Sequence, residues 1–94
     1  MATIHRNDPV RNKVCEIATY WSKPGAALTA LQSILFDHGV ELTHVPSFAV
    51  SDKVPDYTAK FHLSKGGDHL DTALVLSWHW MPSGEQVEVV SYLT

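Results

Sequence analysis

The spacing of apolar residues changes at Val40, and this change constrains the fold more than any other feature of the chain. Before Val40, apolar residues recur every three or four positions, the period of a helix with one buried face. From Val40 onward they alternate, and β-branched and aromatic residues become frequent, as in strands. Because 94 residues support one hydrophobic core, we expect a single α+β domain spanning 1–94.

The N-terminal half predicts two amphipathic helices. The pair Asp8-Pro9 suits a helix start, since Asp caps free N–H groups and Pro is tolerated at the first helical position. We therefore expect a helix over about 9–21. Its apolar stripe consists of Val10, Val14, Ile17 and Trp21.

A second start signal follows at Pro24, and the next apolar stripe runs to His38. Gly39 then supplies a residue that can end a helix in the left-handed conformation. We expect this second helix over about 24–38, so the first half of the chain forms a helical hairpin.

The C-terminal half, about 40–93, predicts an antiparallel sheet of four strands. The expected strands cover about 40–50, 57–65, 69–81 and 86–93. If consecutive strands are neighbours, the sheet is a meander, and both helices pack on one of its faces in the order ααββββ.

Two turns predict the strand register. Gly66-Gly67 suits a two-residue hairpin, so paired residues on its strands should have numbers that sum to 133. Ser83-Gly84 suggests a second hairpin, whose pairs should sum to 167. With both registers, one sheet face is apolar across three strands and should lie under the helices. Its residues are Tyr57, Ala59, Phe61, Leu63, Leu70, Thr72, Leu74, Leu76, Trp78, Trp80, Val87, Val89, Ser91 and Leu93.

The opposite sheet face should be polar, but its centre is apolar. Exposed apolar patches often mark a surface that binds a partner. We therefore predict a partner-binding surface from this centre and the polar pair at its end. Its residues are Ala73, Val75, Val90, Tyr92, His79 and Glu88.

The last strand should be an edge of the sheet, and residues 86–93 contain no proline and one charged residue to discourage pairing. Its cover is expected to be a second copy of the chain, a partner's peptide or the N-terminal segment 2–6 folded back as a strand. The first strand carries Pro46 and resembles a protected or bulged edge.

The chain has six histidines, and the register sets two of them opposite carboxylates. His62 is expected opposite Asp71, and His79 opposite Glu88, each a possible general-base pair. Asp71 and His79 are eight positions apart on one strand, or about 26 Å, so the two pairs cannot share one metal or one substrate atom. His69 lies near His62, but surface ion pairs are the simpler interpretation of this group.

Other chemically distinctive residues fit structural roles. Alternation sends both Trp78 and Trp80 to the helix-covered face, where aromatic rings dominate core packing. Cys15 has no basic neighbour in sequence to activate its thiol, so an inert thiol is expected.

Composition and motifs exclude several classes of function. A formal charge of −3 is too small to favour nucleic-acid binding. The sequence contains no phosphate loop, paired-cysteine motif or dinucleotide fingerprint, so we predict no cofactor and no metal. One cysteine and no apolar stretch of membrane-spanning length favour a cytoplasmic protein.

These observations favour a binding protein over an enzyme. We expect a small protein-interaction module, such as a stoichiometric inhibitor, an immunity-type protein or an accessory protein, that binds another protein through its open sheet face or edge strand and forms a homodimer. One alternative is a small enzyme or ligand-binding domain with a histidine–carboxylate pair at a dimer junction. Another is a pH sensor, because protonation of all six histidines would move the formal charge from −3 to +3.

Overall fold

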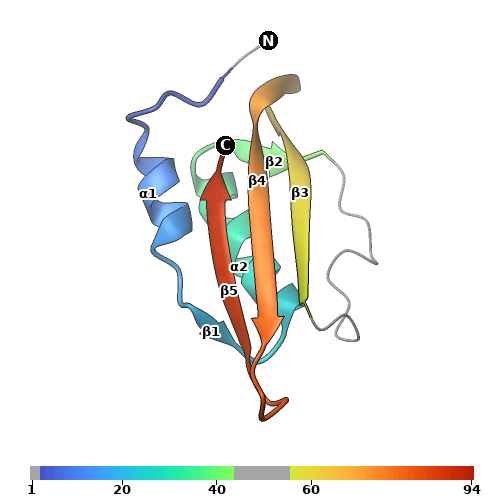
Figure 1. The fold of residues 1–94 in the computed structure, drawn as a ribbon. Helices are drawn as coiled ribbons and strands as arrows, with labels where there is room; N and C mark the ends of the chain where they lie inside the picture. The colour runs from blue at the N-terminus through green and yellow to red at the C-terminus, as the bar shows by residue number, and fades with distance from the viewer. Residues whose placement is uncertain (1–2, 44–55) are drawn as a thin grey trace.

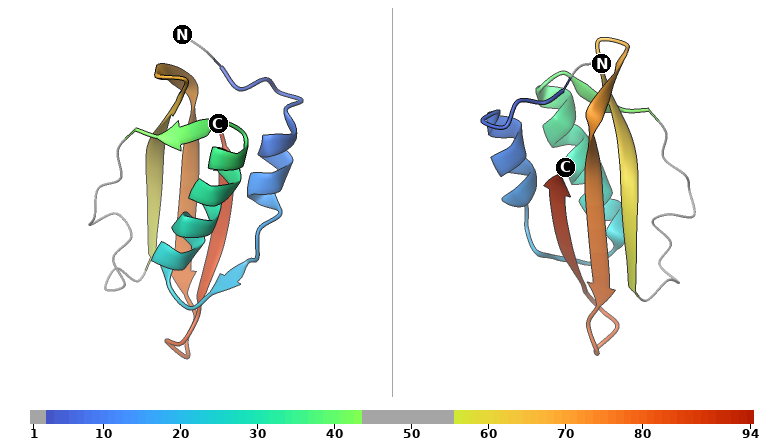
Figure 2. Two further views of the ribbon diagram at one scale, coloured as in Figure 1. Left: turned by 180° about the vertical axis from the view of Figure 1, so that it is seen from behind. Right: turned by 45° about the horizontal axis from the view of Figure 1, so that its top comes forward.

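A computed structural model describes residues 3–43 and 56–94 as an α+β fold of two helices and a five-stranded antiparallel sheet (Figure 1). In the sheet, the strands lie in the order β1-β5-β4-β3-β2. Both helices lie on the same side of it (Figure 2). The elements are α1 Pro9–Cys15, β1 Tyr20–Trp21, α2 Pro24–Asp37, β2 Val40–Leu42, β3 Asp56–Lys65, β4 Asp68–Trp80 and β5 Val87–Leu93.

The first helix is shorter than the predicted 9–21, because α1 ends at Cys15. Asp8 caps it as expected, its Oδ1 accepting the N–H of Val10 at 3.0 Å. Ile17 and Trp21 do pack against the core, but Ile17 lies in a bend and Trp21 in β1. Their helix-like spacing therefore arises because both contact the core, and it does not require a helix. The aromatic residues Tyr20 and Trp21 favour a strand in the segment that becomes β1.

The second helix agrees with the prediction, since α2 spans Pro24–Asp37. The chain leaves it through Gly39, whose φ of 75° lies in the left-handed region. Directly afterwards β2 covers Val40–Leu42. Thr43 follows as a bend, and residues 44–50 of the predicted strand, with Pro46, lie outside the described residues.

The β3–β4 hairpin begins in the predicted register and then departs from it. Lys65 pairs with Asp68 across Gly66-Gly67, both of which have positive φ. Beyond Ser64 the register shifts by two residues. The expected pairing of His62 with Asp71 is therefore wrong, and His62 stands opposite Ala73.

This shift has a physical reason in the core. Between the paired positions, three residues of β4 face the single residue Leu63 of β3. Leu70 and Thr72 are both buried on the inner side of the sheet, while Asp71 between them is exposed. Since the shift is even, every side chain keeps the face that alternation predicts.

The β4–β5 hairpin follows the predicted register throughout, with pairs that sum to 167 from Leu74 opposite Leu93 to Trp80 opposite Val87. The N–H of Met81 donates to the Gln86 carbonyl at 2.9 Å, so the loop has four residues. The pairing of His79 with Glu88 is confirmed.

The face predicted to be apolar is the face that the helices cover. Among its described members, Trp80 is partly buried and all the others are buried. Two of them are polar, and both have partners. Thr72 Oγ1 accepts the Ile4 N–H at 3.3 Å, and Ser91 Oγ donates to the Val14 carbonyl at 2.9 Å. Hydrogen bonding thus compensates for their burial.

The predicted four-stranded order ααββββ is wrong in one respect, because a fifth strand, β1, lies between the two helices in sequence. The last strand was expected to be a sheet edge, but β1 lies beside its first half. Tyr20 pairs with Glu88, and Trp21 pairs with Val87. The described N-terminal residues 3–6 form no strand on β5, and Ile4 is instead buried in the core. Only two residues of β1 pair with β5, so the second half of β5 has no neighbouring β1 residue along its edge.

Candidate functional site

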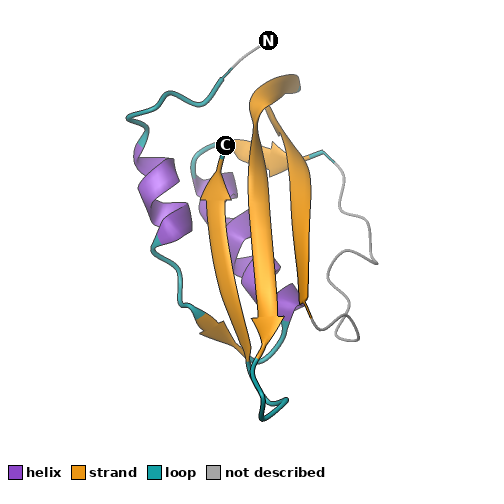
Figure 3. Ribbon diagram, viewed as in Figure 1, coloured by secondary structure: helices purple, strands orange, loops and turns teal. Residues whose placement is uncertain are grey.

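The outer face of the sheet, opposite the helices, is not covered by any helix of the described chain (Figures 2 and 3). Antiparallel registers align its side chains in rows across the strands. One row runs from Thr58 through Ser77 to Val90, and the next from Lys60 through Val75 to Tyr92. In these two rows, the face is polar on β3 and apolar on β5.

Three exposed apolar side chains form what we call the outer patch: Tyr20, Val90 and Tyr92. Their exposed fractions are 52%, 55% and 47%. Val90 and Tyr92 are two positions apart on β5 and therefore lie on the same face. Tyr20 is paired with Glu88, which is two positions before Val90 on that face. Phe36 is the one other large hydrophobic side chain exposed in the described part of the chain. Such residues therefore concentrate on this side of the sheet.

Two other residues of the predicted partner-binding surface lie beneath their neighbours. Ala73 and Val75 are on the outer face but are only 5% and 7% exposed. Val75 stands between Lys60 and Tyr92 in its row. A lysine stem and a tyrosine ring are long enough to cover a central valine. The accessible apolar surface is therefore displaced from β4 toward β5 and β1.

The pair His79–Glu88 lies at one end of the outer patch, in the same row as Tyr20. His79 is exposed and Glu88 is partly buried. A general base needs a concave site that can hold a substrate beside it. Neither of the two hollows described below is lined by this pair. The position of the pair favours a role in the polar rim of the outer patch over a role as a general base.

His62 and Asp71 are not brought together by the structure, and both are exposed. His69 pairs with Ser64 near the Gly66-Gly67 turn. Among residues 3–43 and 56–94, the structure contains no group of three or more histidine, cysteine, aspartate or glutamate side chains able to hold a metal ion.

A first hollow, of about 310 Å³, lies at the edge of β5. One wall is formed by Cys15 at the end of α1 and by Ile17 and Thr19 of the chain that leads to β1. The other wall is β5 itself, from Val89 to Tyr92. This hollow adjoins the outer patch, because Val90 and Tyr92 belong to both. Sequence reasoning missed it, since residues 17–21 were expected to be helical.

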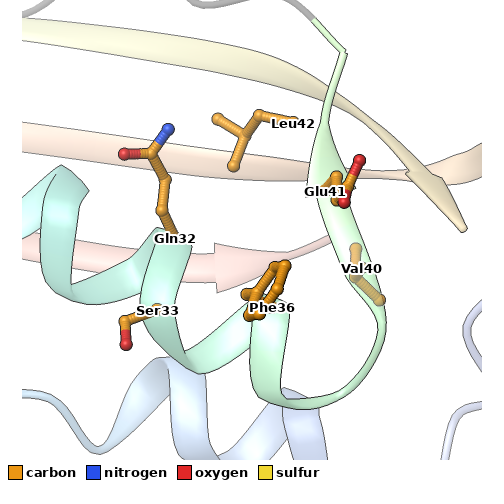
Figure 4. Close-up of a pocket in the computed structure, with 6 residues that line it drawn as sticks. All are labelled: Gln32, Ser33, Phe36, Val40, Glu41 and Leu42. Carbon is orange, nitrogen blue, oxygen red and sulfur yellow. The ribbon is translucent and has the colours of Figure 1, made fainter.

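A second hollow, of about 410 Å³, lies between the end of α2 and β2 (Figure 4). Phe36, 68% exposed, stands beside it, together with Gln32 and Ser33 of α2. From β2 come Val40, Glu41 and Leu42. The sequence signal for this hollow is Phe36 itself, an aromatic residue outside the apolar stripe of its helix.

Comparison with known protein families, with curated proteins and with solved structures finds no match to this chain. In the part of the chain that the structure describes, no helix has the length and apolarity needed to cross a membrane.

Proposed function

We propose that this domain is a protein-interaction module that binds another protein through the outer patch. One observation carries the proposal: three large apolar side chains are about half exposed on a sheet face that no described helix covers. Isolated exposed apolar residues are ordinary, but a continuous group on one sheet face is typical of a partner surface.

The composition of the patch supports this proposal. Tyrosine is enriched among the residues that dominate binding energy, because its ring contributes a large contact area while its hydroxyl stays hydrated. His79, Glu88 and Lys60 lie around the apolar residues and supply a polar rim. An apolar centre with a polar rim is the usual organisation of a specific interface.

A module of this kind acts by occupying a surface of its partner. The proposal therefore includes a stoichiometric inhibitor, an immunity-type protein or an accessory subunit in the cytoplasm. A second copy of the chain is one partner that the same patch could bind, which would make the protein a homodimer.

The test compares two substitutions on the outer face, Val90→Asp and Thr58→Asp. Val90 lies in the outer patch, whereas Thr58 is an exposed residue of the same row on β3. Binding partners are captured from the source cells with the wild-type domain and each variant, and self-association is measured by sedimentation. We expect Val90→Asp to weaken capture or self-association at least tenfold and Thr58→Asp to leave it within twofold.

Circular dichroism and thermal unfolding control for folding of both variants. Equal capture by wild type and Val90→Asp would overturn the proposal. So would a wild-type domain that is monomeric at millimolar concentration and captures nothing.

A further inference from the structure

The edge of β5 is closed at its beginning by the chain that leads into β1. The N–H of Val89 donates to the Thr19 carbonyl at 2.7 Å. The pairs Tyr20–Glu88 and Trp21–Val87 extend this strand pairing to the first residue of β5. Before β1, the chain turns away from β5 toward α1 (Figure 1). The position beside β5 is therefore filled only up to Val89.

The same edge is closed at its end by Arg11 of α1. Its Nη1 donates to the carbonyls of Leu93 and Thr94, at 3.2 and 2.9 Å. Its Nε and Nη2 donate to the carbonyls of His5 and Ile4, which holds the guanidinium in place. The backbone acceptors at the end of β5 are thus already used.

Between these two closures, strand geometry leaves a short open stretch. Backbone groups of alternate residues in a strand point to opposite sides. The Val89 N–H points to the β1 side, and the Thr94 N–H points to β4, where it donates to Ala73. The intervening Ser91 therefore points away from β4.

Four backbone groups face this open stretch: the Val89 carbonyl, the Ser91 N–H, the Ser91 carbonyl and the Leu93 N–H. None of them has a hydrogen-bond partner among the described residues. They border the hollow of about 310 Å³ whose far wall is Cys15, Ile17 and Thr19.

We propose that an extended peptide segment of a partner protein adds to the sheet at this stretch, in line with β1 and opposite Ser91. A row of alternating N–H donors and carbonyl acceptors is matched by the backbone of another extended chain, which is the basis of strand addition. This inference rests on the proposed function, because it states how a protein partner binds beside the outer patch.

The register assigns a role to each partner residue. The residue opposite Ser91 exchanges two backbone hydrogen bonds with it and directs its side chain to the inner side, toward Cys15 and Ile17. The residues before and after it lie on the outer face, beside Val90 and Tyr92. Because none of the residues lining the hollow is charged, the segment is uncharged at all three positions.

A second copy of β5 does not fit the same place. If two β5 strands paired antiparallel about Ser91, Leu93 of the copy would stand opposite Val89. Thr19 already accepts the Val89 N–H from that position. A separate peptide segment can end before it reaches Thr19, and so it is the occupant that we assign.

The probe is a library of acetylated and amidated pentapeptides in which two threonines precede three randomised positions. The central randomised position is the one placed opposite Ser91, so the peptide ends before it reaches Thr19. We expect selected peptides to carry apolar residues on both sides of the central position and to shift the amide resonances of Ser91 and Leu93. N-methylation of the peptide residue opposite Ser91 removes its donor and is expected to weaken binding at least tenfold. N-methylation of the adjacent residue, whose N–H points away from β5, is expected to change binding less than threefold.

Two substitutions at Cys15 give the matched test on the protein. Cys15 is exposed, so neither change disturbs the core. Cys15→Phe fills the hollow and should weaken peptide binding at least tenfold, whereas Cys15→Ser should leave it within twofold. Tyr20→Asp should also leave peptide binding within threefold, because Tyr20 belongs to the outer patch but not to the hollow.

Several results would overturn the strand-addition proposal. These are a library with no binder at millimolar concentration, binding insensitive to N-methylation, binding unchanged in Cys15→Phe, or resonance shifts confined to other strands. If one of these results is found and Val90→Asp still abolishes partner capture, the outer patch remains a binding surface and only the strand-addition proposal fails. Self-association competing with the peptide would assign the stretch to a second copy.

Discussion

Arg11 and Leu93 are 82 residues apart in sequence, yet the Arg11 guanidinium donates a hydrogen bond to the Leu93 carbonyl. The same side chain also bonds the carbonyls of Ile4, His5 and Thr94. One residue of α1 therefore joins the N-terminal segment to the end of the sheet. This arrangement explains why α1 starts close to the last strand.

Arg11→Met should destabilise the fold. The substitution keeps an apolar stem but removes the donors of four hydrogen bonds, and bonds to a charged group contribute about 2 kcal/mol each before solvent replaces part of them. We expect a loss of about 2 kcal/mol in the free energy of unfolding, measured with urea. Lys13→Met, at an exposed position of the same helix, is the control and should cost less than about 0.5 kcal/mol. Equal stability of the two variants would contradict the role given to Arg11.

Ser91→Ala should cost more stability than Ser77→Ala. Ser91 is buried and its Oγ donates to the Val14 carbonyl, so the substitution leaves a carbonyl at the end of α1 without its partner. The expected loss is about 1 kcal/mol. The Ser77 hydroxyl bonds Thr58 on the outer face, where water can replace it, so we expect a change within about 0.5 kcal/mol. Chemical denaturation of both variants measures the difference, and the reverse order would argue against the contact between α1 and β5.

Two apolar residues of α2 should respond very differently to truncation. Leu31 is fully buried, so Leu31→Ala removes core contacts and should destabilise by about 2–5 kcal/mol. Phe36 lies beside the hollow between α2 and β2, and Phe36→Ala should change stability by less than about 0.5 kcal/mol. Thermal and urea unfolding would show both effects. A large loss in Phe36→Ala would mean that its ring is covered in solution.

Two glycines should give changes of opposite sign when replaced by alanine. Gly67 has a φ of 87°, where a Cβ is strained, so Gly67→Ala should cost about 1 kcal/mol. Gly25 lies in the first turn of α2, and a Cβ there meets no atom within 4 Å. Gly25→Ala should therefore stabilise the protein by about 0.5–1 kcal/mol. Melting temperatures of the two variants check the signs, and a stabilising Gly67→Ala would contradict the hairpin geometry.

Much of the sheet was predictable because alternation is a local property. The register of the β4–β5 hairpin followed from its turn, and the buried face followed from parity, which even the shift near Ser64 preserves. That shift was not predictable from the Gly66-Gly67 turn. It depends on how Leu70 and Thr72 both pack into the core opposite Leu63, which is a tertiary requirement.

The candidate site was predictable only in part, for a related reason. Val90 and Tyr92 lie on a strand with clear alternation, so their exposure could be anticipated. Tyr20 could not, because β1 has two residues and Ile17 and Trp21 imitate the spacing of a helix. The position of β1 depends on pairing with β5, and a two-residue strand carries too little sequence signal to show it.

The brevity of the opening on β5 also bears on how the protein avoids aggregation. A long bare strand edge can template sheet growth from one molecule to the next. Here, Thr19 at one end and Arg11 at the other leave only four backbone groups around Ser91. Such an opening offers a second molecule few backbone hydrogen bonds, which limits sheet growth along the β5 edge.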